Sequence, residues 1–133
     1  MVNLYKNIVL FSYLIYVAFF FVPYLDVYLY DQKMFDALSW TGLGALLELN
    51  EGIAYVFLLA YTVALYGLIY FKVWARPTFL GLTFLSIILT GIQGVEVFTP
   101  VDGVLSYITN LADGATIILM YFTSINSRFS ENA

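Results

Sequence analysis

The residues of this chain that could do chemistry are almost all carboxylic acids and hydroxyls. The sequence contains no Cys and no His, which removes thiolate nucleophiles, imidazole bases and the commonest ligands of zinc and haem iron. The sequence shows no pairing of a nucleophile with a base, so a membrane enzyme acting on lipids is disfavoured. We therefore predict a protein that is not an enzyme and that uses no metal or other cofactor. No basic run is present to bind nucleic acid, and the formal net charge is −4.

One acid, Asp113, lies in the middle of a long apolar segment, residues 101–125. An acid at the centre of a bilayer costs about 2.5–3.5 kcal/mol on insertion scales, so we expect it to face protein or a wet cavity. No basic residue lies at its depth, which favours a neutral acid hydrogen-bonded to Ser86 or Thr90. At the same depth the first and second apolar segments offer three further hydroxyls, those of Tyr16, Tyr61 and Thr62.

Asp113 has two interpretations. It could be the protonatable site of a proton-linked carrier, or it could be a polar clasp that fixes how two helices pack. The sequence favours the clasp, because the neighbouring groups are hydroxyls and no second acid or base lies at that depth to complete a proton relay.

Small and polar residues form a stripe along each of the last two apolar segments. The stripes are Thr83, Ser86, Thr90, Gln93 and Gly94 on the third segment, and Gly103, Ser106, Asn110, Asp113, Gly114 and Thr116 on the fourth. Steps of three and four place each set on one helix face. Small residues and interhelical hydrogen bonds drive helix association in lipid. One antiparallel register matches both stripes and predicts contacts of Thr90 with Asn110 and of Gly94 with Ser106.

The second apolar segment carries a weaker stripe of the same kind. It consists of Ala60, Ala64 and Gly67, which again recur at helical spacing. We expect this face to pack closely against a neighbouring helix.

A second group of acids lies near the ends of the apolar segments: Glu48, Glu51, Glu96 and Asp102. Together they could form a cation site with hard oxygen ligands. The sequence lacks the spacing of a calcium-binding loop, and helix capping accounts for Glu48, Glu51 and Asp102. We therefore favour capping and solvation over a metal site.

The elements that carry these residues are predicted to be membrane-spanning helices. Hydrophobic residues make up 62% of the 133 residues and charged residues 11%, against about 25% charged in a soluble domain. Four apolar segments, residues 7–29, 51–71, 78–97 and 101–125, are each long enough to cross about 30 Å of hydrocarbon. Two of the connections are short, which forces antiparallel neighbours. We predict a single all-α domain, an up-down bundle of four transmembrane helices.

Several local signals mark the ends of these helices. Pro23 is expected to kink the first one. Asn50 suits the N-cap of the second, and Thr99, Pro100 and Asp102 resemble a capping box at the start of the fourth.

The polar stretch after the first segment predicts a short helix lying on the membrane surface. Asp31 could cap it, and Met34, Phe35 and Leu38 would share one apolar face. Trp40 then follows at a position typical of an interfacial tryptophan. An ordinary loop is the alternative.

Basic residues predict the orientation. With four spans, one side of the membrane holds four of the five basic residues, Lys6, Lys72, Arg76 and Arg128, and the other holds Lys33. The positive-inside rule then places both termini in the cytoplasm, and the membrane would be a bacterial inner membrane.

The sequence predicts function mainly by what it lacks. A chain with little mass outside the membrane has its helix surfaces as the main binding area. We therefore expect a small protein that acts by helix–helix contact, as an accessory subunit of a membrane complex or an immunity-type partner-binding protein. Its partners would be the lipid bilayer and other membrane subunits or copies of itself. The alternative is a small proton-linked transporter or channel centred on Asp113.

Overall fold

A computed structural model describes residues 1–47 and 51–130. Regular structure in these residues is entirely helical. The elements are α1 (Val2–Phe21), η1 (Val22–Tyr24), α2 (Asp26–Leu29), α3 (Gln32–Leu38), α4 (Glu51–Ile69), α5 (Ala75–Ile92), α6 (Pro100–Phe122) and α7 (Ile125–Ser130). Four segments are long and apolar enough to cross a membrane: Val2–Tyr24, Gly52–Ile69, Ala75–Ile92 and Pro100–Phe122. The predicted all-α class and the four candidate spans are confirmed.

The boundaries of two spans differ from the prediction. Helix α1 begins at Val2 rather than near residue 7, and a 3₁₀ turn containing Pro23 follows its end at Phe21, which fits the expected interruption. Helix α5 ends at Ile92, short of the predicted residue 97. Gly94 has a φ of +84°, a left-handed conformation that cannot continue an α-helix.

The caps predicted at Asp31 and Thr99 are confirmed. The Asp31 side chain accepts a hydrogen bond from the backbone N–H of Met34 at 3.2 Å and caps α3. The Thr99 hydroxyl accepts from the backbone N–H of Asp102 at 3.1 Å and donates to the Asp102 carboxylate at 2.7 Å. The expected cap at Asn50 lies outside the described residues.

Helix α3 has the predicted two-sided character. Met34, Phe35 and Leu38 are partly buried, whereas its other residues are exposed, as is Trp40 after it. The position of α3 at a membrane surface remains a prediction.

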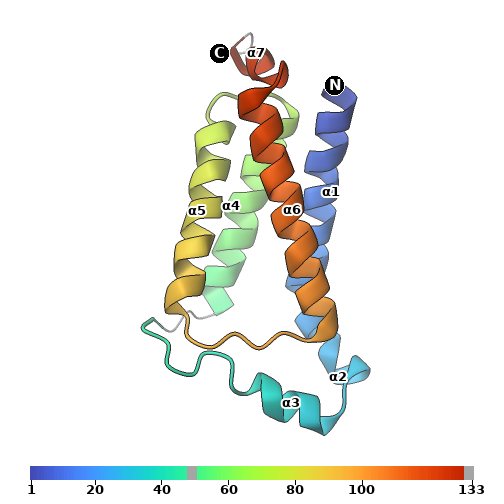
Figure 1. Cartoon of the computed structure of the whole chain (residues 1–133), viewed down its shortest axis with the longest axis vertical. Coiled ribbons are helices and arrows are strands. Elements are labelled where there is room, and N and C mark those ends of the chain that lie inside the picture. The colour runs from blue at the N-terminus through green and yellow to red at the C-terminus, as the bar shows by residue number, and fades with distance from the viewer. Residues whose placement is uncertain (48–50, 131–133) are drawn as a thin grey trace.

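The long helices form two pairs that are joined through α1 and α4. Helix α6 packs along α1, α4 packs along α5, and α1 also contacts α4, whereas α5 and α6 barely touch. Successive long helices run in opposite directions, so both ends of the chain lie at the same end of the bundle (Figure 1). We call this the terminal end, and the opposite end the loop end.

Buried apolar residues concentrate toward the terminal end. Tyr5, Phe71 and Phe129 are buried and pack on one another with ring centroids 5.4–6.3 Å apart: Tyr5 stacks on Phe71, and Phe129 meets both rings edge-on. The guanidinium of Arg76 lies over the rings of Tyr121 and Phe129, at 4.3 and 5.1 Å from their centroids, in cation–π contact. The bundle is therefore tightly packed at the terminal end, where α4 turns into α5.

Candidate functional site: a polar cavity between α5 and α6

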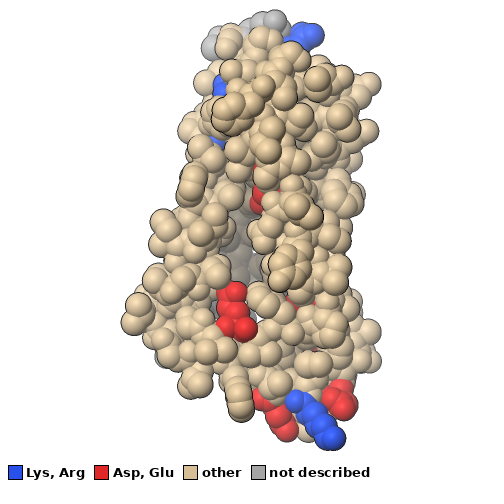
Figure 2. Space-filling model, in the orientation of Figure 1, with Lys and Arg blue, Asp and Glu red and all other residues tan. Residues whose placement is uncertain are grey.

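A cavity of about 400 Å³ lies where α5 and α6 separate, and we call it the Asp113 cavity. Its polar lining comes from two facing helices. Helix α5 contributes Thr83, Ser86 and Thr90, and α6 contributes Ser106, Asn110 and Asp113. Figure 2 shows this face of the molecule hollowed along its middle, with acidic atoms beside the hollow. Residues from both predicted polar stripes, on α5 and α6, therefore line the same open cavity.

Asp113 lies at the wall of this cavity and is held by two hydroxyls from other helices. Its Oδ1 accepts a hydrogen bond from Ser12 Oγ of α1 at 2.7 Å and another from the Tyr61 hydroxyl of α4. Ser12 is fully buried, and Asp113 and Tyr61 are 7% and 5% exposed. One carboxylate oxygen thus ties α6 to both α1 and α4.

Aromatic rings hold the Tyr61 hydroxyl in place. The Tyr16 ring lies 4.2 Å from the Tyr61 ring, and Phe79 of α5 lies 5.4 Å from it on centroid distances. Such packing restricts the rotation of Tyr61 and so fixes the direction of its O–H. Tyr16 also lines the Asp113 cavity.

The predicted partners of Asp113 on α5 are wrong. Ser86 Oγ donates to the backbone carbonyl of Thr83 at 2.8 Å, and both Ser86 and Thr90 line the cavity without reaching the acid. Thr62, expected at the same depth, donates to the backbone carbonyl of Leu58 at 2.7 Å instead. The prediction failed because it assumed that α6 packs against the helix preceding it, whereas α6 packs against α1.

The predicted seam between the two stripes is also wrong. Thr90 and Asn110 lie on different helices that line the Asp113 cavity, and both are exposed. Gly94 lies beyond the end of α5 and packs against the loop before α4: a Cβ there would lie 2.6 Å from Ala45 N and from Leu43 O. Ser106 lines the cavity rather than meeting Gly94.

The other predicted packing residues have mixed outcomes. Ala64 is fully buried, and a Cβ on Gly67 would lie 2.6 Å from Ala75 Cβ, so these two residues do mark a close approach. Ala60 is only partly buried. Gly103 and Gly114 mark no close approach, because a Cβ at Gly103 would meet only Phe98 Cβ at 4.0 Å and one at Gly114 would meet nothing within 4 Å.

Ser12 was missed by the sequence analysis. It is one hydroxyl in an apolar segment, but it shares a helix face with Tyr5, Val9 and Tyr16 at steps of four, three and four residues. Tyr5, Val9 and Ser12 are all fully buried. This spacing was the signal that could have identified the buried face of α1.

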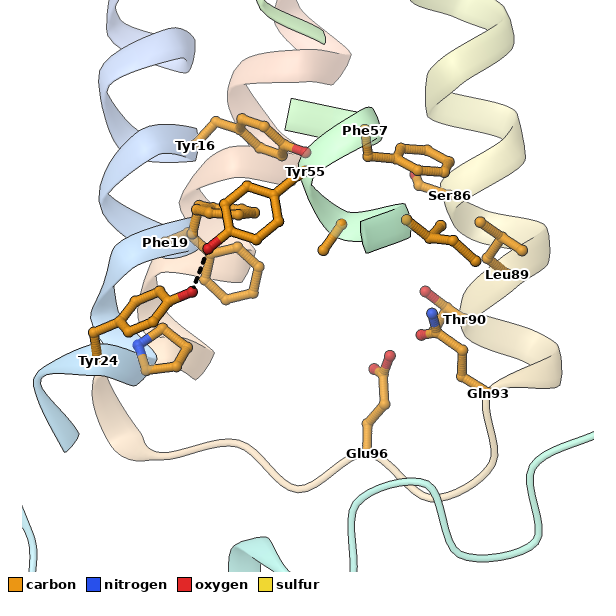
Figure 3. A pocket seen from close by; sticks show the side chains of 14 residues that line it. Tyr16, Phe19, Tyr24, Tyr55, Phe57, Ser86, Leu89, Thr90, Gln93 and Glu96 are labelled. Carbon is orange, nitrogen blue, oxygen red and sulfur yellow. Dashed lines mark hydrogen bonds between the residues drawn. The ribbon is translucent and has the colours of Figure 1, made fainter. Parts of the chain in front are cut away.

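A second, wider hollow of about 670 Å³ adjoins the Asp113 cavity toward the loop end, and we call it the Glu96 vestibule. The two spaces share lining residues on α1, α4 and α5, among them Tyr16, Phe57 and Thr90. In Figure 3 the Glu96 side chain extends from the loop after α5 into the vestibule, on the side of Thr90 and Gln93. Burial raises the pKa of Glu96 above its usual range.

The opposite wall of the vestibule is aromatic. Tyr24 and Tyr55 join α4 to the turn after α1 through a hydroxyl–hydroxyl bond of 2.7 Å (Figure 3). Phe19 and Phe20 extend this wall, and the Phe20 ring packs against Tyr55, whereas Phe57 lies on the side of Ser86 (Figure 3).

The predicted acids at the loop end divide into different environments. Asp102 is buried and belongs to the α6 cap, as favoured by the sequence. Glu48 and the side chain of Glu51 lie outside the described residues. Among the residues that the structure does describe, no group of three or more Asp, Glu, His or Cys side chains is placed to hold a metal ion.

Asp26 is a further buried acid that the sequence did not single out. It is 5% exposed, and its Oδ1 has no hydrogen-bond partner among the described residues. Burial and the nearby charge of Asp102 raise the pKa of Asp26.

The comparisons with known proteins add no relative. No protein-family model, curated protein or solved structure matches this chain. The site must therefore be interpreted from its own chemistry.

The described lining of the vestibule and the Asp113 cavity is acidic, and no basic side chain in it balances the acids. Within the described residues, the linings of the vestibule and the cavity include the carboxyl groups of Glu96 and Asp113 and no Lys or Arg. Such an arrangement can accept a proton or a cation, and hydroxyl and amide groups lie along the way between the two acids.

Proposed function

We propose that this chain is an integral membrane protein that conducts or carries protons or small cations through the space between α5 and α6. The supporting observation is the Asp113 cavity, in which a buried acid is reached through a polar space that opens toward Glu96. An intramembrane acid that faces a cavity is the usual mark of an ion or proton pathway. This interpretation reverses the preference drawn from sequence, in which Asp113 was mainly a clasp.

The bonds of Asp113 are compatible with both roles. Its Oδ1 is held by Ser12 and Tyr61, while the residue as a whole also lines the cavity. A group that is fixed on one side and reachable on the other can bind and release a proton without disturbing the packing of α1 against α6.

The proposed orientation places both termini in the cytoplasm, in a bacterial inner membrane, with the vestibule and α3 on the opposite side. The distribution of Lys and Arg supports it. Because the chain has no Cys, each introduced Cys is a unique label. An impermeant maleimide added outside spheroplasts should label a Cys at residue 33 and leave one at residue 130 unlabelled. The opposite pattern would reverse the orientation.

The conduction proposal is tested in two steps. First, Cys replacing Asn110, which lines the cavity, should react with an impermeant thiosulfonate, whereas Cys replacing Leu111, its exposed neighbour outside the lining, should not. Protection of both positions would mean that the cavity is closed to water.

Second, proteoliposomes that contain a pH-sensitive dye should show protein-dependent proton or cation flux. Asp113→Asn should abolish the flux while the protein still purifies as a folded species, because an amide cannot take up a proton near neutral pH. Flux that is unchanged in this variant would contradict the role of Asp113.

The second candidate function is the accessory or partner-binding role predicted from sequence. The observation that favours it is the exposed apolar surface of α5, which includes Phe84, Ile87 and Ile88 and which the other described helices leave uncovered. Such a surface is available to a neighbouring membrane helix. A stable complex with a different membrane protein after detergent extraction would favour this role, and a homodimer with proton flux would favour conduction.

A further inference from the structure

We propose that the Glu96 vestibule binds a lipophilic organic cation, a molecule with a positive charge and an aromatic or branched apolar body. This inference rests on the proposed conduction function and names the class of molecule that would use the pathway. It comes from the size, the lining and the charge of the vestibule.

The size of the vestibule suits an organic molecule. Its volume of about 670 Å³ lies within the range of about 300–1,000 Å³ that is typical of sites for small ligands. The adjoining Asp113 cavity extends it deeper between the helices. A hydrated proton or a bare metal ion needs no space of this size.

The lining of the vestibule suits an apolar cation. Six aromatic side chains line it, from α1, the turn after α1, and α4: Tyr16, Phe19, Phe20, Tyr24, Tyr55 and Phe57. The face of an aromatic ring attracts a cation, and more strongly when the cation is poorly hydrated. The Tyr24–Tyr55 hydroxyl bond holds two of these rings in place before a ligand arrives, which lowers the cost of ordering them.

The charge of the site disfavours anions, and its geometry disfavours divalent metal ions. Glu96 extends into the vestibule opposite Tyr24 and Tyr55 (Figure 3). Asp113 lines the adjoining Asp113 cavity, which Glu96 also lines. An anion would meet two acids and, within the described lining, no basic side chain. A divalent metal ion requires several oxygen ligands at one point, and the described residues provide no such group.

Two nearly isosteric ions test the proposal directly. Tetraphenylphosphonium and tetraphenylborate have similar size and opposite charge, so their comparison isolates the sign of the charge. Equilibrium dialysis with the purified protein in dodecyl maltoside should show saturable binding of tetraphenylphosphonium and none of tetraphenylborate. Equal saturable binding of the two ions, after subtraction of their uptake by protein-free micelles, would overturn the proposal.

Variants locate the binding. Glu96→Gln should raise the Kd for tetraphenylphosphonium by about tenfold, which corresponds to about 1.4 kcal/mol. Phe57→Leu keeps the apolar bulk and removes the ring, so it should also weaken binding. Asp36→Asn is the matched control, since Asp36 is an exposed acid on α3 outside both linings, and its Kd should not change.

The outcomes separate this inference from the conduction proposal. Circular dichroism and gel filtration first establish that each variant is folded, and Tyr55→Phe provides a milder variant that keeps the ring. Selective binding without any proton or cation flux would retain the site and reject conduction. Flux with no selective binding, or binding that is unaffected by both Glu96→Gln and Phe57→Leu, would reject the organic cation.

Discussion

Replacing Asp113 separates its structural role from its chemical role. In Asp113→Asn the amide oxygen can still accept from Ser12 and Tyr61, and the new N–H₂ group can point into the cavity. We expect this variant to lose less than about 0.6 kcal/mol of stability, the average for one interhelical hydrogen bond in a membrane protein.

Asp113→Leu should cost considerably more. It removes both hydrogen bonds, and double-mutant cycles in a membrane protein give about 0.6 kcal/mol on average and about 1.7 at most for each such bond, so we expect a loss of about 1–3 kcal/mol. The Ser12 and Tyr61 hydroxyl oxygens lie 3.5 Å apart and can bond to each other once the acid is gone. This new bond restores part of the lost stability, so the expected loss is smaller than it would be if both hydroxyls had no hydrogen-bond partner.

The measurement is reversible unfolding by sodium dodecyl sulfate in mixed micelles, followed by circular dichroism. Ser12→Ala serves as the internal control, because it deletes one of the two bonds. It should cost less than Asp113→Leu. In the Asp113→Leu background it should cost only the Ser12–Tyr61 bond that forms there, because the bond to the acid is already gone. A Leu variant as stable as the Asn variant would refute the assignment of Asp113 as the link between α1, α4 and α6.

Three further predictions concern other residues. Gly94→Ala should lower the midpoint of unfolding, because a φ of +84° disfavours alanine and the backbone of the loop before α4 leaves no room for a Cβ. Gly91→Ala, in open space on α5, should not lower the midpoint in the same assay. Thermal unfolding should show Thr99→Ala losing about 1 kcal/mol of stability and Thr99→Ser nearly none, because only the alanine removes the cap of α6; equal losses would reject the cap. Asp26 has a raised pKa in the folded protein, so the folded state binds the extra proton, and stability should fall as pH rises from the ordinary Asp value through the raised one. Asp26→Asn should flatten this fall in thermal scans that start near the ordinary Asp pKa and continue to higher pH, and an unchanged pH profile would contradict the raised pKa of Asp26.

The sequence was sufficient to predict the four long helices and α3 because their signals are local. The four apolar segments, the cap at Asp31 and the Thr99–Pro100–Asp102 start of α6 each depend on residues within one or two turns. The end of α5 was missed because Gly94 was interpreted as a helix-packing residue, although a glycine directly after a helix is also a common signal of its C-terminal end. Only the structure shows that Gly94 is left-handed and leaves the helix.

The site was harder to predict because it depends on which helices are neighbours. Periodicity correctly placed Asp113, Asn110 and Ser106 on one face of α6, but it cannot say what that face meets. The short connection after α5 suggested α5 as the partner, and the main contact is instead with α1, the most distant span in sequence. Lipid supplies no hydrophobic drive between helices, so interhelical hydrogen bonds such as Ser12 to Asp113 contribute to the choice of neighbour.

The link between Ser12 and Asp113 has a consequence for the synthesis of the chain. The two residues are 101 positions apart, which a ribosome covers in about 5–20 s. In the membrane protein proposed above, α1 would by then lie in the bilayer without α6, its main contact, and the Ser12 hydroxyl would have no acid to donate to. The contacts of α1 can therefore form completely only after α6 has been synthesised. A ribosome that stalls between the third and fourth spans would leave a membrane intermediate for quality-control proteases to recognise.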